Sequence, residues 1–296
     1  MYLTGIADEA SQDIKEQISA TKELGWNAIE SRFINGKNIH DISEEEFEQV
    51  ISALDGSGVY INAFGSAIGN WGMDIRDDFS ITEAEISRAI PRMKKLGAKF
   101  VRIMSYKVLD QEDQLVDERI RRLRLIVEAF SNEGITAVHE NCMNYGGMSW
   151  RHTLDLIEAV PGMKLVFDTA NPAFNRDRSK PGEPWQNPLE FYQNVKEHIS
   201  YVHIKDCLSP SPENDNKEVY TYPGVGHGCV KEILQDLKES GYEGGISIEP
   251  HLAAVFHDTD SQNQTNEDPK DIYIRYGREL MSILDSIGYQ YVAYSS

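Results

Sequence analysis

An eightfold alternation of helical and short apolar segments is the feature that most constrains the fold of this 296-residue chain. Each helical pattern ends at a Gly or a turn and is followed by an apolar run, as at 13–24, Gly25 and the run WNAIESRF. Several of these runs are continuously apolar, which is typical of parallel strands covered on both faces. We therefore predict an α/β fold in which residues 1–296 form a single (β/α)8 TIM barrel. A doubly wound sheet with a second domain is the alternative.

Residue pairs typical of helix N-termini locate the starts of several helices. Residues 43–46 and 82–85 both read Ser/Thr-x-x-Glu, which is the spacing of a capping box. Residues 187–188 read Asn-Pro and residues 268–269 read Asp-Pro, which is typical of an N-cap followed by the first helical residue. We therefore expect a helix to begin at each of these four positions.

The connections between the segments differ in length according to their direction. Helix-to-strand connections are short, whereas four strand-to-helix connections are long. The long ones span residues 62–81, 169–187, 206–227 and 250–267. In a barrel, strand-to-helix loops lie at the carboxyl ends of the strands, where barrel enzymes have their active sites. We therefore predict a ligand site at that rim.

Charge and cysteine content argue against several classes of partner. The chain has 29 Lys and Arg against 48 Asp and Glu, and its formal net charge is −19. Nucleic acids and anionic membranes are bound by basic surfaces, so we expect neither as a partner. Cys142, Cys207 and Cys229 form no paired motif, and no segment approaches 18 apolar residues. The N-terminus lacks the pattern of a signal peptide, and we predict a cytoplasmic protein.

Four consecutive strand segments end in a side chain that can bind a metal ion. They read VHEN, FDTAN, YVHIKD and SIEPH and carry Glu140, Asp168, His203 and Glu249. A carboxylate at the end of an apolar strand is costly to bury unless a cation compensates it. For each residue alone, exposure to solvent or helix capping would be an ordinary explanation, but the shared position of all four favours one site. Three carboxylates and one imidazole suit Mn²⁺, Mg²⁺, Co²⁺ or Zn²⁺.

Side chains two residues from these ligands point to the same face of their strand. We therefore expect Lys205 and His251 to face the site as candidate substrate ligands. Arg102, at the end of the fourth strand, could bind a substrate hydroxyl or acid group, or form a structural ion pair. Ser66, in the loop stretch at 65–70, could also reach a ligand.

Other polar positions have more ordinary explanations. Arg32, at the end of the second strand, could bind substrate or pair with a nearby acid. The candidate acids are Asp8, Glu9 and Glu30. His139 and Asp206 have the opposite alternation and are expected to support the site or cap a helix. Residues 224–226 read Gly-x-Gly and could cradle a phosphate, although a tight turn also explains them. The histidines of the long loops are His227 and His257.

In their order along the chain, VHEN, FDTAN, YVHIKD and SIEPH resemble the motifs of the xylose isomerase-like TIM barrels. Within these they resemble the sugar phosphate isomerase/epimerase group, also named AP endonuclease family 2, and the resemblance covers essentially the whole chain. It implies one divalent metal ion held by Glu140, Asp168, His203 and Glu249. By similarity to the ketose 3-epimerases of this superfamily, it also implies that Glu140 and Glu249 are the acid/base pair.

Two positions differ from those epimerases. The epimerases have a His three residues after the Asp ligand, where this chain has Asn171. They also have an Arg shortly after the His of the seventh strand, where this chain reads Lys-Asp-Cys at 205–207. HIKD is more similar to the inositol-catabolism branch and to isomerase branches without an assigned activity. We expect Asn171 to contact the substrate, and we transfer no other substrate contact.

We predict an isomerase or epimerase that acts on a small sugar, sugar phosphate or polyol-derived ketone through a metal-stabilised enediolate. An inosose-type dehydratase shares the first step and is the main alternative. A hydrolase of abasic DNA would need more histidines and a basic surface, and a sugar-binding barrel without activity would not need both glutamates. The expected partner is a small sugar or polyol, and a homo-oligomer is compatible with the sequence.

Overall fold

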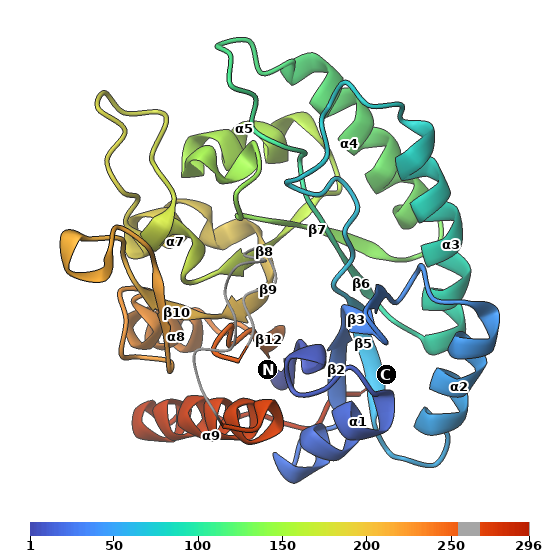
Figure 1. The fold of residues 1–296 in the computed structure, drawn as a ribbon. Helices are drawn as coiled ribbons and strands as arrows, with labels where there is room; N and C mark the ends of the chain where they lie inside the picture. The colour runs from blue at the N-terminus through green and yellow to red at the C-terminus, as the bar shows by residue number, and fades with distance from the viewer. Residues whose placement is uncertain (254–266, 296) are drawn as a thin grey trace.

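Eight parallel strands form the centre of the structure, a computed structural model that describes residues 1–253 and 267–295 (Figure 1). They lie in the order β1, β12, β9, β8, β7, β6, β5, β2. A parallel bridge between Ile6 and Glu30 brings β1 beside β2, so the sheet forms a nearly closed barrel. The strands are β1 (Tyr2–Gly5), β2 (Ala28–Ser31), β5 (Tyr60–Phe64), β6 (Phe100–Ile103), β7 (Thr136–Glu140), β8 (Lys164–Asp168), β9 (Ile199–Ile204) and β12 (Gly245–Ile248).

A helix follows each barrel strand and lies on the outside of the barrel (Figure 1). In the helix after β9, Val230, Ile233, Leu234 and Leu237 are buried, which is the helical spacing of an apolar stripe. The predicted (β/α)8 barrel is confirmed. The alternating helices are α1 (Ile14–Glu23), α2 (Glu44–Leu54), α3 (Ser80–Leu96), α4 (Val116–Ser131), α5 (Trp150–Ala159), α7 (Pro188–Val195), α8 (Val230–Glu239) and α9 (Pro269–Ile287).

Three of the four predicted helix starts are confirmed and one is wrong. Ser43 accepts a hydrogen bond from the Glu46 amide and donates its own amide to the Glu46 carboxylate, which completes the capping box of α2. The other confirmed N-caps are Asn187 and Asp268. At 82–85 the helix has already begun two residues earlier, at Ser80. Thr82 is therefore inside the first turn, where its hydroxyl bonds to the Tyr106 hydroxyl instead of capping.

The interior of the barrel changes from apolar to charged along the strand direction. One hydrophobic cluster lies toward the amino ends of the strands. It includes Tyr2, Phe100, Val138, Val166 and Tyr201. Side chains two residues further along a strand point to the same face, and here this next layer is polar. Its members are Thr4, Arg102, Glu140, Asp168 and His203. The candidate site therefore rests on an apolar layer that separates it from the opposite end of the barrel.

Short additional elements lie mainly in the long strand-to-helix loops. Two of them are hairpins, one after β2 and one after β9. Residues 254–266 of the loop after β12, including His257, lie outside the described residues. The additional elements are β3 (Phe33–Ile34), β4 (Lys37–Asn38), β10 (Asp206–Leu208), β11 (Val219–Thr221), α6 (Asn171–Phe174) and the 3-10 helices η1 (Ala7–Glu9), η2 (Gly146–Met148), η3 (Lys196–His198) and η4 (Pro212–Asn214).

Helix hydrophobicity and cysteine pairing are the features of the described residues that bear on membranes and disulfides. Across the described ranges, no helix combines the length and the apolar character needed to cross a membrane. None of the three cysteines forms a disulfide. Cys142 and Cys207 are buried, and burial raises the pKa of both thiols, so that both are protonated at neutral pH.

The segment after the β3–β4 hairpin is fixed to α3 by a buried arginine. Arg92 donates to the carbonyl oxygens of Ile39 at 2.9 Å and Ile42 at 2.8 Å. His40, between these two residues, is fully buried. Burial lowers the pKa of His40 to about 4, although the neighbouring Asp41 opposes the shift. At neutral pH the imidazole is therefore uncharged in the folded chain.

We expect His40 to make the fold sensitive to acid. Because its pKa is about 4 when folded and about 6.5 when unfolded, the unfolded chain binds more protons between these values. Its contribution to the free energy of unfolding is therefore lost as the pH falls through this range, by roughly 1–3 kcal/mol. His40→Phe should lose less stability than the wild type between pH 7 and pH 4.5 in urea denaturation. Equal losses in the two proteins would contradict this expectation.

Candidate active site and metal centre

The four predicted metal ligands lie together at the carboxyl ends of neighbouring strands. In the sheet order β7, β8, β9, β12 they are Glu140, Asp168, His203 and Glu249. One ligand atom from each residue lies within 4.8 Å of the others, and all four side chains are buried. The sequence therefore identified residues that the fold brings into one cluster.

The donor atoms of this cluster fit a cation. Glu140 Oε2, Asp168 Oδ2 and His203 Nδ1 are buried and make no hydrogen bond among the described residues, although Arg102 and Lys205 form ion pairs with the first two at 3.1 and 3.0 Å. Leaving such an atom without a hydrogen bond typically costs about 1–3 kcal/mol, and a bound cation would offset this cost. Three carboxylates and an imidazole form a mixed oxygen and nitrogen set that several divalent ions accept. The residues therefore fit a divalent metal ion, whose identity the donor set does not decide.

Glu30 fixes the orientation of the histidine ligand. His203 Nε2 lies 2.9 Å from a Glu30 carboxylate oxygen, which leaves Nδ1 facing Glu249 at 3.6 Å and Glu140 at 4.0 Å. Burial lowers the pKa of His203, but Glu30 and Glu249 outweigh it and raise the pKa to about 10. The sequence suggests Glu30 only as a partner for an arginine. The signal that could have identified its role is a carboxylate inside a buried strand, the same signal that identified the ligands.

Lys205 lies between two of the candidate ligands. Its Nζ atom is 3.0 Å from Asp168 Oδ2 and 3.1 Å from Glu249 Oε2, and the side chain is buried. Burial lowers the pKa of Lys205, but the two carboxylates outweigh it and hold the pKa well above its usual range. Burial also raises the pKa of Asp168 to about 6, against the opposing effect of Lys205. Lys205 therefore supplies a fixed positive charge at the centre of the cluster.

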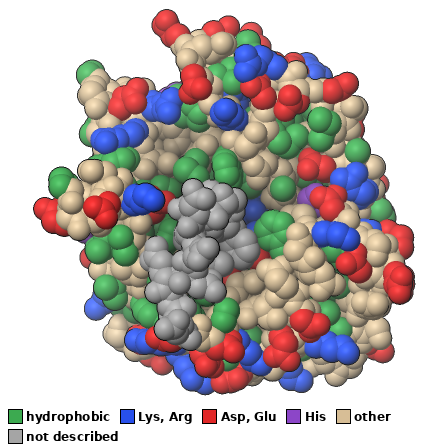
Figure 2. Space-filling model, viewed as in Figure 1, with side chains coloured by type: hydrophobic (Ala, Val, Ile, Leu, Met, Phe, Trp, Pro, Cys, Tyr) green, Lys and Arg blue, Asp and Glu red, His purple; other side chains and the backbone are tan. Residues whose placement is uncertain are grey.

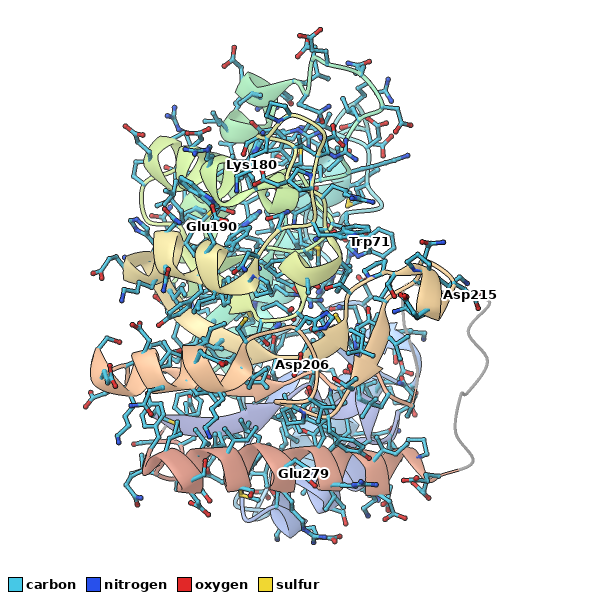
Figure 3. The ribbon with its side chains drawn as sticks, turned by 90° about the vertical axis from the view of Figure 1, so that its left-hand side faces the viewer. Trp71, Lys180, Glu190, Asp206, Asp215 and Glu279 are labelled. Carbon is cyan, nitrogen blue, oxygen red and sulfur yellow. The ribbon has the colours of Figure 1, made fainter. Side chains whose placement is uncertain are left out.

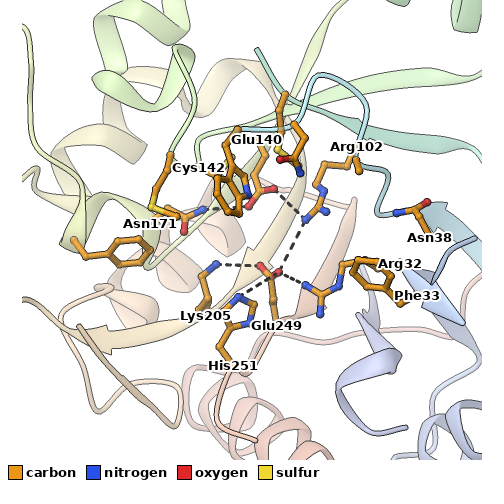
Figure 4. A pocket seen from close by; sticks show the side chains of 16 residues that line it. Arg32, Phe33, Asn38, Arg102, Glu140, Cys142, Asn171, Lys205, Glu249 and His251 are labelled. Atoms are coloured by element: carbon orange, nitrogen blue, oxygen red, sulfur yellow. Dashed lines mark hydrogen bonds and ion pairs between the residues drawn. The ribbon is translucent and has the colours of Figure 1, made fainter. Parts of the chain in front are cut away.

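Glu249 is the acid with the most cationic neighbours in this cluster (Figure 4). Arg32 Nη1 lies 2.9 Å from its Oε1, and Arg102 Nη1 and His251 Nε2 lie 4.0 and 3.9 Å from the same oxygen. Burial raises the pKa of Glu249, but Lys205 and His251 outweigh it and hold the pKa well below its usual range. Glu249 is therefore ionised at neutral pH.

Arg102 connects the loop after β5 to the other glutamate. Its Nη1 lies 3.1 Å from Glu140 Oε2, and it donates to the carbonyl oxygens of Gly65 and Ser66. The Ser66 hydroxyl donates to the Arg102 carbonyl oxygen at 2.5 Å and is fully buried, so it fixes the loop instead of lining the pocket. Asn171 lines the pocket and donates to Glu140 Oε1 at 3.1 Å.

A second buried group lies behind Glu249. Arg32 pairs with Asp8 at 3.0 Å and with Glu9 at 3.3 Å, two of the acids considered from the sequence. Glu9 accepts hydrogen bonds from the His251 backbone amide at 2.6 Å and pairs with its Nδ1 at 2.8 Å. His251 has a φ of 54°, in the left-handed region that costs a non-glycine residue free energy, and these two contacts hold it there. Its Nε2 atom is thereby turned toward Glu249.

His139 and Cys142, the polar neighbours of Glu140 in sequence, belong to a hydrogen-bond network. His139 Nε2 bonds to Ser105 Oγ at 3.0 Å, and Ser105 donates to Asn144 Oδ1 at 2.7 Å. Asn144 also donates to Cys142 Sγ. These contacts give His139 the supporting role that we expected from its alternation, and they agree with Cys142 as a packed thiol that lines the pocket.

Glu140 and Glu249 of the cluster belong to the polar part of a cavity of about 130 Å³ (Figure 4). Hydrophobic side chains border the hollow near the centre of the face in Figure 2. The sequence does not indicate this apolar part of the cavity lining, because aromatic residues in loops form no pattern from which a site can be predicted. Its larger members are Phe33, Trp71, Met104, Met143 and Phe174.

The Gly-x-Gly at 224–226 has an anion partner inside the chain. Asp206 accepts hydrogen bonds from the backbone amides of Gly224, Gly226 and Gly228 at 2.8–2.9 Å, and from that of Cys207 at 2.9 Å. Asp206 is fully buried and thus supports its own loop, as its alternation indicated. His227, in the same loop, is exposed and accepts from the Ser209 amide, outside the pocket lining.

The family of the chain follows from its sequence. The profile of the family described as "Xylose isomerase-like TIM barrel" matches residues 18–271, so the chain belongs to this family. The resemblance of the four strand-end motifs is thereby confirmed.

Individual relatives are distant. An inosose dehydratase of Lacticaseibacillus casei is 23% identical over 195 residues, which cover 57% of this chain and 62% of the relative's length. Two solved structures share the fold over 97% of this chain. A D-tagatose 3-epimerase-like protein is 17% identical over 98% of its own chain, with a TM-score of 0.71. A xylose isomerase-like TIM barrel protein from Mycobacterium smegmatis, in complex with magnesium, is 16% identical over 97% of its chain, with a TM-score of 0.68.

We expect Glu30→Gln to weaken binding of a divalent metal ion by about 10–100-fold, because a neutral amide orients the His203 ring less firmly than a carboxylate does. Isothermal titration with Mn²⁺ measures this effect. The exposed Glu45→Gln is the matched control and should bind Mn²⁺ like the wild type. Unchanged affinity in Glu30→Gln, with an intact fold by circular dichroism, would contradict the role of Glu30.

Proposed function

We propose that this chain is a metal-dependent isomerase or epimerase of a small sugar or polyol-derived ketone. The observation that carries the proposal is the buried cluster of Glu140, Asp168, His203 and Glu249, with ligand atoms within 4.8 Å of one another. A divalent ion held there would polarise the carbonyl oxygen of the substrate and stabilise the negative charge of an enediolate. The family of the chain and its epimerase-like structural neighbour support the proposal.

In this proposal Glu140 and Glu249 transfer the proton next to the carbonyl. They end the outer two of four neighbouring strands, with Asp168 and His203 between them. A base on each side of a planar enediolate can remove a proton from one face and return it to the other, which is epimerisation. Return of the proton to the neighbouring carbon is aldose–ketose isomerisation. The pKa of Glu249, held well below its usual range, keeps this base ionised at neutral pH.

Lys205, Arg102, Asn171 and His251 bind substrate oxygens in the same proposal. All four line the cavity beside the two glutamates. The charges of Lys205 and Arg102 stabilise negative charge that develops on a substrate oxygen, and they are already oriented by their carboxylate partners. The Asn171 amide, which donates to Glu140, would orient both that base and a substrate hydroxyl.

A dehydratase acting on an inosose-type ketone is the second candidate. The L. casei relative carries this activity in its name, and its similarity is detectable in sequence. Dehydration begins with the same removal of a proton next to the carbonyl, after which a hydroxyl on the next carbon leaves. The two candidates therefore differ in product and not in the first step.

We expect Glu140→Gln and Glu249→Gln each to slow solvent deuterium incorporation next to the carbonyl by about 10²–10⁴-fold, because each loses a general base. NMR in D₂O with Mn²⁺ and a panel of ketoses and inososes measures the exchange and separates epimerised, isomerised and dehydrated products. Glu243→Gln, an exposed control on the same segment as Glu249, should keep the wild-type rate. Wild-type exchange in either site variant, with metal bound, would refute the two-base scheme.

Removal of the divalent ion should also stop the exchange in the wild-type chain. We expect EDTA to abolish deuterium incorporation and added Mn²⁺ to restore it, because the developing negative charge is no longer stabilised without the cation. Exchange that continues at an unchanged rate in metal-free protein, verified by elemental analysis, would exclude the proposed metal dependence.

A further inference from the structure

We infer that the substrate of this site is an uncharged sugar or polyol ketone and not a phosphate ester. The inference rests on the proposed function and narrows its substrate class. Three features of the described residues carry it, namely the cations of the pocket, the backbone amides near it and its apolar part.

The cations that line the described pocket already compensate carboxylates. Arg32 lies 2.9 Å from one Glu249 oxygen, and Lys205 lies 3.1 Å from the other. Arg102 lies 3.1 Å from Glu140. A phosphate dianion would have to compete with these buried carboxylates for the same three side chains. The free-energy cost of separating a carboxylate from its cation is larger in a site shielded from water.

Acidic groups outnumber these cations around the site. Six buried carboxylates lie in or directly behind the cluster, against three Lys and Arg side chains. They are Asp8, Glu9, Glu30, Glu140, Asp168 and Glu249. A divalent ion bound by three of these carboxylates would bring the sum of these charges from −3 to −1. The described site therefore has no surplus of positive charge to attract a phosphate ester.

At two places in the described part of the chain, backbone amides that could bind a phosphate are already engaged. Barrel enzymes commonly bind a phosphate with the loops after strands seven and eight. In the loop after β9, the seventh barrel strand, the carboxylate of Asp206 binds the amides of Gly224, Gly226 and Gly228. At the start of α6, the amides of residues 170 and 171 bind Asp168 Oδ1 at 2.9 and 2.7 Å. The chain supplies its own anion at both places.

The remaining lining suits the C–H surface of an uncharged ligand. Phe33, Trp71 and Phe174 contribute aromatic rings to the cavity, and apolar pockets with a few oriented polar groups are typical of small neutral ligands. In Figure 3, Trp71 and Asp215 lie toward the right-hand side of the molecule, whereas Asp206 lies nearer its centre. Trp71 therefore lies toward the outer part of the site.

Matched pairs of substrates test the inference. The Mn²⁺-loaded wild-type chain is incubated in D₂O with free ketoses and inososes and with their monophosphate esters, and exchange and dehydration are followed by NMR. We expect kcat/KM for the free compound to exceed that for its ester by at least about 100-fold. Equal or higher kcat/KM for the ester overturns the inference and leaves the proposed function intact. No reaction of either member of any pair overturns the proposed function and the inference with it.

A pair of variants tests the reason for the preference. Trp71→Lys adds a cation to the rim of the pocket, and Trp71→Met adds a side chain of similar length without charge. We expect the ratio of kcat/KM for free compound over ester to fall at least about fivefold in the Lys variant relative to the Met variant. Equal ratios in the two variants would show that the lack of a free cation does not exclude the phosphate, and would overturn the argument.

Discussion

Compensation of buried negative charge is the constraint on which the rest of this site depends. Glu249, Glu140 and Asp168 are buried at one end of the barrel. The free-energy cost of burying these charges is offset only if cations lie within contact distance. Lys205 and Arg102 meet that requirement at 3.0–3.1 Å. The same arrangement keeps Glu249 ionised and leaves donor atoms suited to a divalent ion. The charge balance of the site and the arrangement of its candidate metal ligands are therefore properties of one network.

The barrel makes this concentration of charge compatible with a stable fold. Parallel strands place inward-facing side chains in layers, so the apolar layer of Val138 and Val166 lies directly beneath Glu140 and Asp168. The backbone is satisfied within the sheet, and the loops beyond the strand ends supply further contacts. Asp206 is another buried carboxylate whose charge is compensated by nearby donors. It accepts hydrogen bonds from four backbone amides and thereby orders a glycine-rich loop.

Much of the fold and of the candidate metal site could be predicted from the sequence. The helix-to-strand alternation and the motifs at the strand ends repeat, and repetition makes a weak local signal specific. The error at Thr82 has a local cause, because the helix begins at Ser80 and a tertiary contact with Tyr106 takes the hydroxyl that would have capped it. Ser66, which the sequence suggests as a ligand-binding residue, donates its hydroxyl to the Arg102 carbonyl oxygen. The sequence does not reveal this contact.

By itself, the sequence determined the barrel, the rim that carries the site and the four side chains that meet there, because periodicity and strand-end position are local properties. Only the tertiary structure decided which charges neutralise one another. Glu30 pairs with His203 across 173 positions of the chain, and Arg32 with Glu249 across 217. Such partners are chosen by three-dimensional proximity, which depends on how the barrel closes and not on any spacing along the chain.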